Sequence, residues 1–306
     1  MFANQATPES TTTAPGLLDV AARVRQIELI TRRLVNDTMA GQYHAVFKGR
    51  GMSFDSVREY EPGDDIRTID WNVSARTGGV FVKQYVEERE LTVLLAVDVS
   101  ASMDVGTVLR SKRELAAEVA AVLAFSALSN NDRVGLVLFS DRVEHYVPPK
   151  KGRGHVLRMV TDLLRISPQG RQTRLDMVCD ELSRMVRKRS VVFLLSDFLD
   201  SEFDRAFGVL ARRHDAVPVM ICDPVEEKFP DLGGLIALHD AETGRIEWLD
   251  SSSASVRTAY WQRQAVIRRK AEQTLRKHGA EPIGARVGDD YVPSLVTYFR
   301  RRAARQ

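Results

Sequence analysis

The sequence predicts an α/β fold with a mostly parallel β-sheet that has helices on both faces, preceded by an N-terminal helix and a charge-rich segment. Short apolar runs, typical of buried strands, recur from Leu91 onward, and most of them are followed by a stretch with apolar residues at helical spacing. Regular alternation of such strands and helices favours a parallel sheet covered on both sides.

Composition indicates a soluble globular protein, since 44% of the 306 residues are hydrophobic and 28% are charged. No run approaches the roughly 18 uncharged apolar residues of a membrane span, so none is expected. Residues 1–16 are polar and predict a disordered tail rather than a secretory signal. Cys179 and Cys222 lie in apolar contexts, which predicts reduced thiols and a cytoplasmic location.

Charge and motifs argue against several functional classes. The 44 basic and 41 acidic residues leave a net charge of +3, too small to indicate nucleic-acid binding. The basic stretches at 149–155 and 298–305 lack the interleaved aromatic residues that stack on bases, so we interpret them as solvated surface. The sequence contains no Cys/His metal spacing, no GxSxG nucleophile motif and no GxxxxGK phosphate loop.

The N-terminal quarter predicts three elements. Apolar residues at helical spacing indicate a helix over residues 17–40. A short helix is expected over Ile66–Arg76, with Asp65 as its N-cap and the glycine pair at 78–79 at its end. Residues 80–86 alternate between apolar and polar side chains, which predicts a strand.

The rest of the chain predicts the main sheet and its helices. Strands are expected at 91–99, 133–141, 190–198 and 216–223, with a short strand at 142–148 paired beside the second. Helices are expected at 111–130, 153–165, 174–188, 202–213, about 254–278 and about 291–303. A hairpin over 235–250 is expected to form an antiparallel edge of the sheet.

Oxygen-bearing side chains gather where the predicted strands end. They are Asp98, Ser100 and Ser102 after the first strand, Thr173 just before a helix, and Asp197 after the third main strand. The carboxyl ends of parallel strands meet at one edge of a sheet, and alternate residues of a tight loop can project to one side. Oxygen ligands suit Mg²⁺, or Mn²⁺ in its place. With few anionic ligands, the ion would attract an incoming carboxylate. The alternative is that Asp98 and the serines only cap the following helix.

This pattern resembles the metal-ion-dependent adhesion site (MIDAS) of von Willebrand factor A domains. The resemblance lies in "DVSASM" (98–103), "GRQT" (170–173) before a helix, and "LLSDF" (194–198). It implies a von Willebrand A-like, Rossmann-like sheet and direct ligation of the ion by Ser100, Ser102 and Thr173. Asp98 and Asp197 would act largely through water, and a partner's acidic side chain would fill the last position.

A second resemblance covers about residues 17–303. The stretch "VFKGRGMSFDSVREYEPGDDIRTIDWNVSARTGGVFVKQYVEERE" (46–90) is similar to the signature of the bacterial domain-of-unknown-function 58 (DUF58) family, as are "RRHDAVPVMICDP" (212–224) and "HDAETGRIEWLDS" (239–251). The resemblance implies three parts: a tail (1–16), an N-terminal helix with the signature segment (17–90), and a von Willebrand A-like domain with C-terminal helices (91–303). It also implies a MoxR-type AAA+ ATPase as partner. Arg174 departs from the expected pattern, which has an aspartate after the threonine.

The signature segment mixes acidic and basic residues. The acidic ones are Asp64, Asp65, Asp70, Glu87, Glu88 and Glu90, and the basic ones are Arg58, Arg67, Arg76 and Arg89. An acid/base or second metal site is one interpretation. We favour a charge-paired brace that Trp71 and Tyr60 pack against the main domain, because carboxylates paired with arginines have lowered pKa values and suit ion pairing better than general acid catalysis.

The sequence therefore predicts a non-catalytic, divalent-cation-dependent interaction module. We expect it to be a chaperone-like adaptor for a MoxR-type AAA+ ATPase in protein maturation or complex assembly, docking through an acidic side chain of the ATPase. The alternative is a metal-dependent phosphoester hydrolase that uses the ion as a Lewis acid. That enzyme would need a general base, for which Asp104, Asp141 and Asp200 are the candidates.

Overall fold

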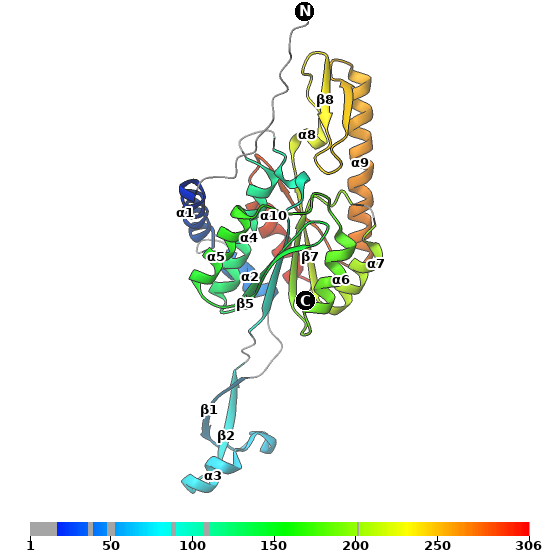
Figure 1. The fold of residues 1–306 in the computed structure, drawn as a ribbon. Coiled ribbons are helices and arrows are strands. Elements are labelled where there is room, and N and C mark those ends of the chain that lie inside the picture. Colours follow the sequence, from blue (N-terminus) through cyan, green and yellow to red (C-terminus); the bar gives the residue numbers. More distant parts are fainter. Residues whose placement is uncertain are drawn as a thin grey trace, which may run out of the picture.

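A six-stranded β-sheet forms the centre of the protein, and helices cover both of its faces (Figure 1). The computed structural model describes residues 17–35, 39–47, 53–86, 90–106, 110–200 and 202–305. In spatial order the strands are β10 (Ile283–Arg286), β7 (Asp215–Cys222), β6 (Val191–Ser196), β3 (Thr92–Asp98), β4 (Arg133–Phe139) and β5 (Val143–Lys150). Every neighbouring pair is parallel except β4 and β5. The predicted mostly parallel α/β sheet is confirmed.

The helices divide between two apolar layers. On one face lie α1 (Leu17–Leu34), α2 (Ala40–Val46), α4 (Lys112–Ser129), α5 (Arg153–Arg165) and α10 (Val292–Ala303). On the other lie α6 (Leu175–Met185), α7 (Asp204–Arg213) and the C-terminal part of α9 (Ala254–Lys277). Helix α4 is buried along most of its length, because α1, α2 and α5 pack on it from outside the sheet. In the described residues no helix is long and apolar enough to cross a membrane.

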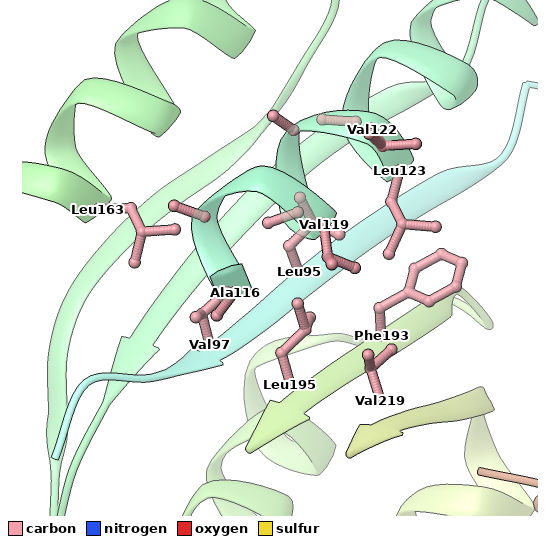
Figure 2. Close-up of a cluster of buried hydrophobic side chains, with 14 of the residues drawn as sticks. Leu95, Val97, Ala116, Val119, Val122, Leu123, Leu163, Phe193, Leu195 and Val219 are labelled. Carbon is pink, nitrogen blue, oxygen red and sulfur yellow. The ribbon is translucent and has the colours of Figure 1, made fainter. Parts of the chain in front are cut away.

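Strand β3 lies inside the sheet and contributes side chains to both layers. Val93, Leu95 and Val97 face the α4 layer, whereas Leu94 and Ala96 face the α6 layer. Figure 2 shows Leu95 and Val97 meeting α4 together with side chains from β6 and β7. Each large apolar side chain buried in this way stabilises the fold by roughly 1.5–3 kcal/mol. An apolar run with two buried faces therefore positions the end of β3.

Residues 53–86 of the signature segment form an arm that projects from the body in Figure 1. Its strands β1 (Ser53–Glu59) and β2 (Phe81–Val86) form an antiparallel pair, and η2 (Ile66–Thr68) and α3 (Trp71–Thr77) lie between them. The predicted single helix over Ile66–Arg76 is divided in two, because Asp65 caps η2 and Asp70 caps α3. Gly78 ends α3 in the left-handed conformation, with a φ of 77°, as expected for a glycine at a helix C-terminus. Strand β1 was not predicted.

The proposed brace is only partly correct. Arg58 pairs with Asp64 at 2.6 Å, so the expected ion pairing exists there. Trp71, however, is 69% exposed and does not pack the segment against the main domain. Glu90 pairs with Lys151 and Arg133 of the body instead of with the arm. Glu87, Glu88 and Arg89 lie outside the described residues, as does the predicted tail (1–16).

One other prediction of local structure was wrong, and a second is refined. The hairpin of β8 (Leu235–His239) and β9 (Ile246–Asp250) forms a sheet of its own and not an edge of the main sheet. The edge strands of the main sheet are β5 and β10, and β10 is a short parallel strand that pairs with β7. The helix expected over residues 17–40 is helical at every described position: α1 ends at Leu34, Val35 and Met39 are π-helical, and α2 begins at Ala40. The remaining short elements are η3 (Ala101–Asp104) and α8 (Pro224–Glu227).

Candidate metal-binding site

The predicted site lies at the topological switch point of the sheet. From β3 the chain runs to β4 on one side, whereas β6 lies on the other side of β3. Ligand sites of open α/β sheets form in the crevice at such a point, at the carboxyl ends of the strands. Asp98 ends β3, Asp197 follows β6, and Thr173 precedes α6. The sheet therefore brings all five predicted residues to one place.

Asp98 is fully buried and fixes the loop after β3. Its Oδ1 accepts a hydrogen bond from the backbone N–H of Ser100 at 2.9 Å, and its Oδ2 accepts one from the Ser196 hydroxyl at 2.6 Å. Burial, together with the nearby charge of Asp197, raises the pKa of Asp98. Both Asp98 oxygens are thus engaged in shaping the loop, which agrees with a role other than direct ligation.

Three hydroxyl oxygens from two loops lie next to one another. Ser100 Oγ is 3.1 Å from Ser102 Oγ and 2.8 Å from Thr173 Oγ1. Mg²⁺ holds oxygen ligands at 2.0–2.1 Å in octahedral geometry, which places neighbouring ligands about 2.9 Å apart. The observed spacings match that distance. Since no group of three His, Cys, Asp or Glu residues with metal-site geometry occurs in the described part of the chain, any ion here would depend on hydroxyl ligands.

Asp197 is buried beside a lysine that the sequence did not indicate. Its Oδ2 accepts hydrogen bonds from the Ser102 hydroxyl at 2.8 Å and from Lys112 Nζ at 2.9 Å. Lys112 also pairs with Glu226 of α8. Burial alone would raise the pKa of Asp197, but the Lys112 ammonium outweighs it and lowers that pKa. Burial would likewise lower the pKa of Lys112, but Asp197 and Glu226 raise it. Asp197 and Lys112 therefore hold each other in their charged forms, whereas burial raises the pKa of Glu226.

The loop that carries Thr173 is fixed by backbone contacts. Arg171 O accepts from the backbone N–H of Ala101 at 3.0 Å, and the backbone N–H of Arg174 donates to Ser140 O at 3.2 Å. Gly170 leaves no room for a side chain, because a Cβ there would overlap Ser140 and Asp141. On the opposite side, Phe198 has a φ of 56°, an uncommon left-handed conformation that turns the chain directly after Asp197. The loop that carries Thr173 is thus held against the loop that follows β3.

A further carboxylate reaches the site from the β8–β9 hairpin. Glu242 Oε1 accepts a hydrogen bond from the Thr173 hydroxyl at 2.8 Å, and Oε2 accepts one from the Thr173 N–H at 3.4 Å. Burial raises the pKa of Glu242. Neither Glu242 nor Lys112 was predicted from the sequence. Glu242 belongs to a polar turn and Lys112 to the first turn of a helix, which are positions where charged residues are usually solvated.

The three carboxylates proposed as a hydrolytic base are all engaged elsewhere. Asp104 pairs with Arg113 and Asp141 with Arg142, each at 2.9 Å. Asp200 accepts the backbone N–H groups of Leu175 and Glu202. In the described residues, each of these three carboxylates is therefore already held by another group.

Comparison with known proteins identifies the family. The sequence model of the family described as "Protein of unknown function DUF58" matches residues 56–271, more than two thirds of the chain. The chain belongs to the DUF58 family. This DUF58 protein is 31% identical over 290 residues to an uncharacterized protein of Mycobacterium tuberculosis, covering 93% of the present chain and 91% of that protein.

Solved structures with a similar fold have low sequence identity. One is an aerotolerance-related membrane protein of Bacteroides fragilis, 18% identical, with a TM-score of 0.46 and coverage of 71% of this chain and 100% of that one. Another is the SpRpn10 VWA domain, 10% identical, with a TM-score of 0.34 and coverage of 69% and 95%. The assignment to the DUF58 family therefore rests on the sequence match and not on these structures.

Proposed function

We propose that this DUF58 protein is a non-catalytic interaction module that binds its partner through a divalent cation, Mg²⁺ or Mn²⁺. The observation that carries the proposal is the cluster of Ser100, Ser102 and Thr173 hydroxyls, with oxygen–oxygen distances of 2.8–3.1 Å. These three oxygens would be the direct ligands. Asp98 and Asp197 would hold the loops in place and supply negative charge near the ion without ligating it directly.

The chemistry of this ligand set favours an acidic partner. Hydroxyl ligands are neutral, so a bound divalent cation would keep most of its charge and attract a carboxylate. Lys112 offsets part of the negative charge of Asp197, with 2.9 Å between Nζ and Oδ2, which leaves the ion still more dependent on an external anion. A single metal–carboxylate bond needs little buried area and suits reversible docking.

We further propose that the partner is a MoxR-type AAA+ ATPase, for which the DUF58 protein would act as an adaptor in protein maturation or complex assembly. The similarity of the signature segment to its family supports this choice. Docking that forms and breaks within an ATPase cycle would agree with a contact that depends on one ion.

Calorimetry with Mn²⁺ tests the site. Ser100→Ala and Thr173→Ala should each weaken binding about tenfold or more, since each removes a ligand oxygen. Ser183→Ala is the matched control, because Ser183 is a buried serine of α6 whose hydroxyl donates to Cys179 O, away from the site. Unchanged Mn²⁺ affinity in both site variants would contradict the assignment.

A pull-down with the MoxR-type ATPase tests the partner. Wild-type protein should retain the ATPase in Mg²⁺ and lose it in EDTA, whereas Ser100→Ala should lose it in both. Retention in EDTA would contradict the metal-bridged contact, and failure to bind in either buffer would contradict the choice of partner.

A further inference from the structure

The tip of the β8–β9 hairpin is built to present Glu242. Asp240 Oδ1 accepts the backbone N–H groups of Glu242 at 3.0 Å and Thr243 at 3.2 Å. Gly244 closes the turn with a φ of 71°, and its N–H donates to Asp240 O at 2.8 Å. Arg171, two residues before Thr173, donates to Ala241 O at 3.3 Å. The tip is thus ordered by its own turn and anchored to the loop that carries Thr173.

Glu242 has no cationic partner among the described residues. It is half-buried, and its hydrogen-bond donors include the hydroxyl and the backbone N–H of Thr173. Asp197 adds negative charge nearby, and Lys112 offsets only part of it. Removing a carboxylate from water next to other carboxylates is costly unless a positive charge compensates it. This arrangement therefore calls for a cation among these oxygens.

The position of Glu242 is that of a ligand. Its Oε1 is 2.8 Å from Thr173 Oγ1, the same distance that separates Thr173 Oγ1 from Ser100 Oγ. Two neighbouring ligands of an octahedral Mg²⁺ are about that far apart. A carboxylate oxygen of this chain thus lies next to the hydroxyl cluster, at the place where a partner's acidic side chain would have to enter.

We infer that Glu242 is an internal ligand of the cation, which holds the coordination position of the partner's carboxylate until the β8–β9 hairpin moves away. This inference rests on the proposed metal-dependent function. It makes the hairpin a competitor of the partner, so that docking requires exchange of one carboxylate for another.

The two strands of the hairpin bury few apolar side chains, so little packing opposes such an exchange. Leu235, Ile246 and Trp248 are 59–70% exposed, and only Leu249 of the two strands is buried. Gly233 and Gly234, with φ values of 74° and 115°, precede β8 and provide a hinge. A cavity of about 800 Å³ lies beside Glu242, lined also by Ser102, Thr173 and Tyr260. A partner's acidic segment has room there once the tip has moved.

Glu242→Ala tests the inference, with Glu247→Gln as control, because Glu247 is an exposed carboxylate on the same hairpin. Mn²⁺ serves as the probe. Glu242→Ala should bind Mn²⁺ at least about tenfold more weakly than wild type. Its bound Mn²⁺ should enhance water proton relaxation more strongly, because water replaces the carboxylate. Glu247→Gln should behave as wild type does in both measurements.

Hydrogen exchange of the hairpin gives an independent measurement. Mn²⁺ should slow amide exchange over residues 235–250 in wild type and in Glu247→Gln, but not in Glu242→Ala at a saturating Mn²⁺ concentration. If wild type binds Mn²⁺ and Glu242→Ala matches it in affinity, relaxation and exchange, the inference is wrong and the proposed function stands. If wild type binds no Mn²⁺, both are wrong.

Discussion

Replacing Lys112 with methionine should destabilise the protein strongly. The Lys112 side chain is 1% exposed, and its ammonium lies 2.9 Å from Asp197 Oδ2 while also pairing with Glu226. Methionine keeps most of the apolar stem but removes the charge, so the buried Asp197 and the half-buried Glu226 lose their cation. Breaking a buried ion pair by removing one partner costs about 3–5 kcal/mol.

That loss is large enough to measure by thermal or urea unfolding in EDTA. For a folded unit of roughly 200 residues, about 3–5 kcal/mol corresponds to a fall in melting temperature of about 6–20 °C. Lys188→Met is the control, because Lys188 is exposed, and it should change the free energy of unfolding by less than about 0.5 kcal/mol. Adding Glu226→Gln to Lys112→Met should recover part of the loss, because it removes one of the stranded charges.

The result that would refute this reasoning is a free energy of unfolding for Lys112→Met within about 0.5 kcal/mol of wild type, as for Lys188→Met. The ammonium would then not hold the loop after β6 to α8. A large loss that Glu226→Gln does not reduce at all would show instead that the stem of Lys112, rather than its charge, is the stabilising part.

Two other changes test the surroundings of the site and the core. Gly170→Ala should lower the free energy of unfolding by about 1–3 kcal/mol and weaken Mn²⁺ binding, since the added Cβ would overlap Ser140 and Asp141 and displace the Thr173 loop. Gly154→Ala is the control, because a Cβ there meets no atom within 4 Å, and it should change neither stability nor Mn²⁺ binding. Equal behaviour of the two variants would contradict the prediction. Burial, aided by the charges of Arg213 and Arg189, lowers the pKa of His214 in the folded protein. The unfolded chain therefore binds a proton at His214 more readily than the folded chain does. The free energy of unfolding should thus fall as pH drops below about 6.5, by at most about 1.4 kcal/mol per pH unit. In urea unfolding, the free energy of unfolding should differ less between pH 5 and pH 8 for His214→Leu than for wild type. An equal difference in both proteins would contradict this prediction.

Most of the main sheet could be predicted because its signals are local. The predicted strands of the sheet and the helices 111–130, 153–165 and 254–278 agree with the observed elements to within a few residues. Their apolar periodicity reports which faces are buried, whatever lies opposite them. The short strand β10 escaped prediction, since four residues give too brief a pattern, and its position depends on pairing with β7, about 60 residues earlier.

The five predicted site residues could also be found from sequence, for a topological reason. Each follows a parallel strand or precedes a helix, and parallel strands end at the same edge. The spacing of Asp98, Ser100 and Ser102 and their order relative to Thr173 and Asp197 thus determined that these side chains would meet.

Only the tertiary structure decided which charges enter the site from elsewhere. Lys112 meets Glu226 across 114 positions of sequence, and Thr173 meets Glu242 across 69. In the sequence, Lys112 stands in a first helical turn and Glu242 in a polar turn, where each would normally face water. A charged side chain becomes buried only when a partner compensates the loss of hydration, and that partner comes from long-range packing. The sequence by itself therefore determined the sheet and the five residues at its edge. The positions of the Lys112 ammonium and the Glu242 carboxylate beside those residues depend on the folded chain.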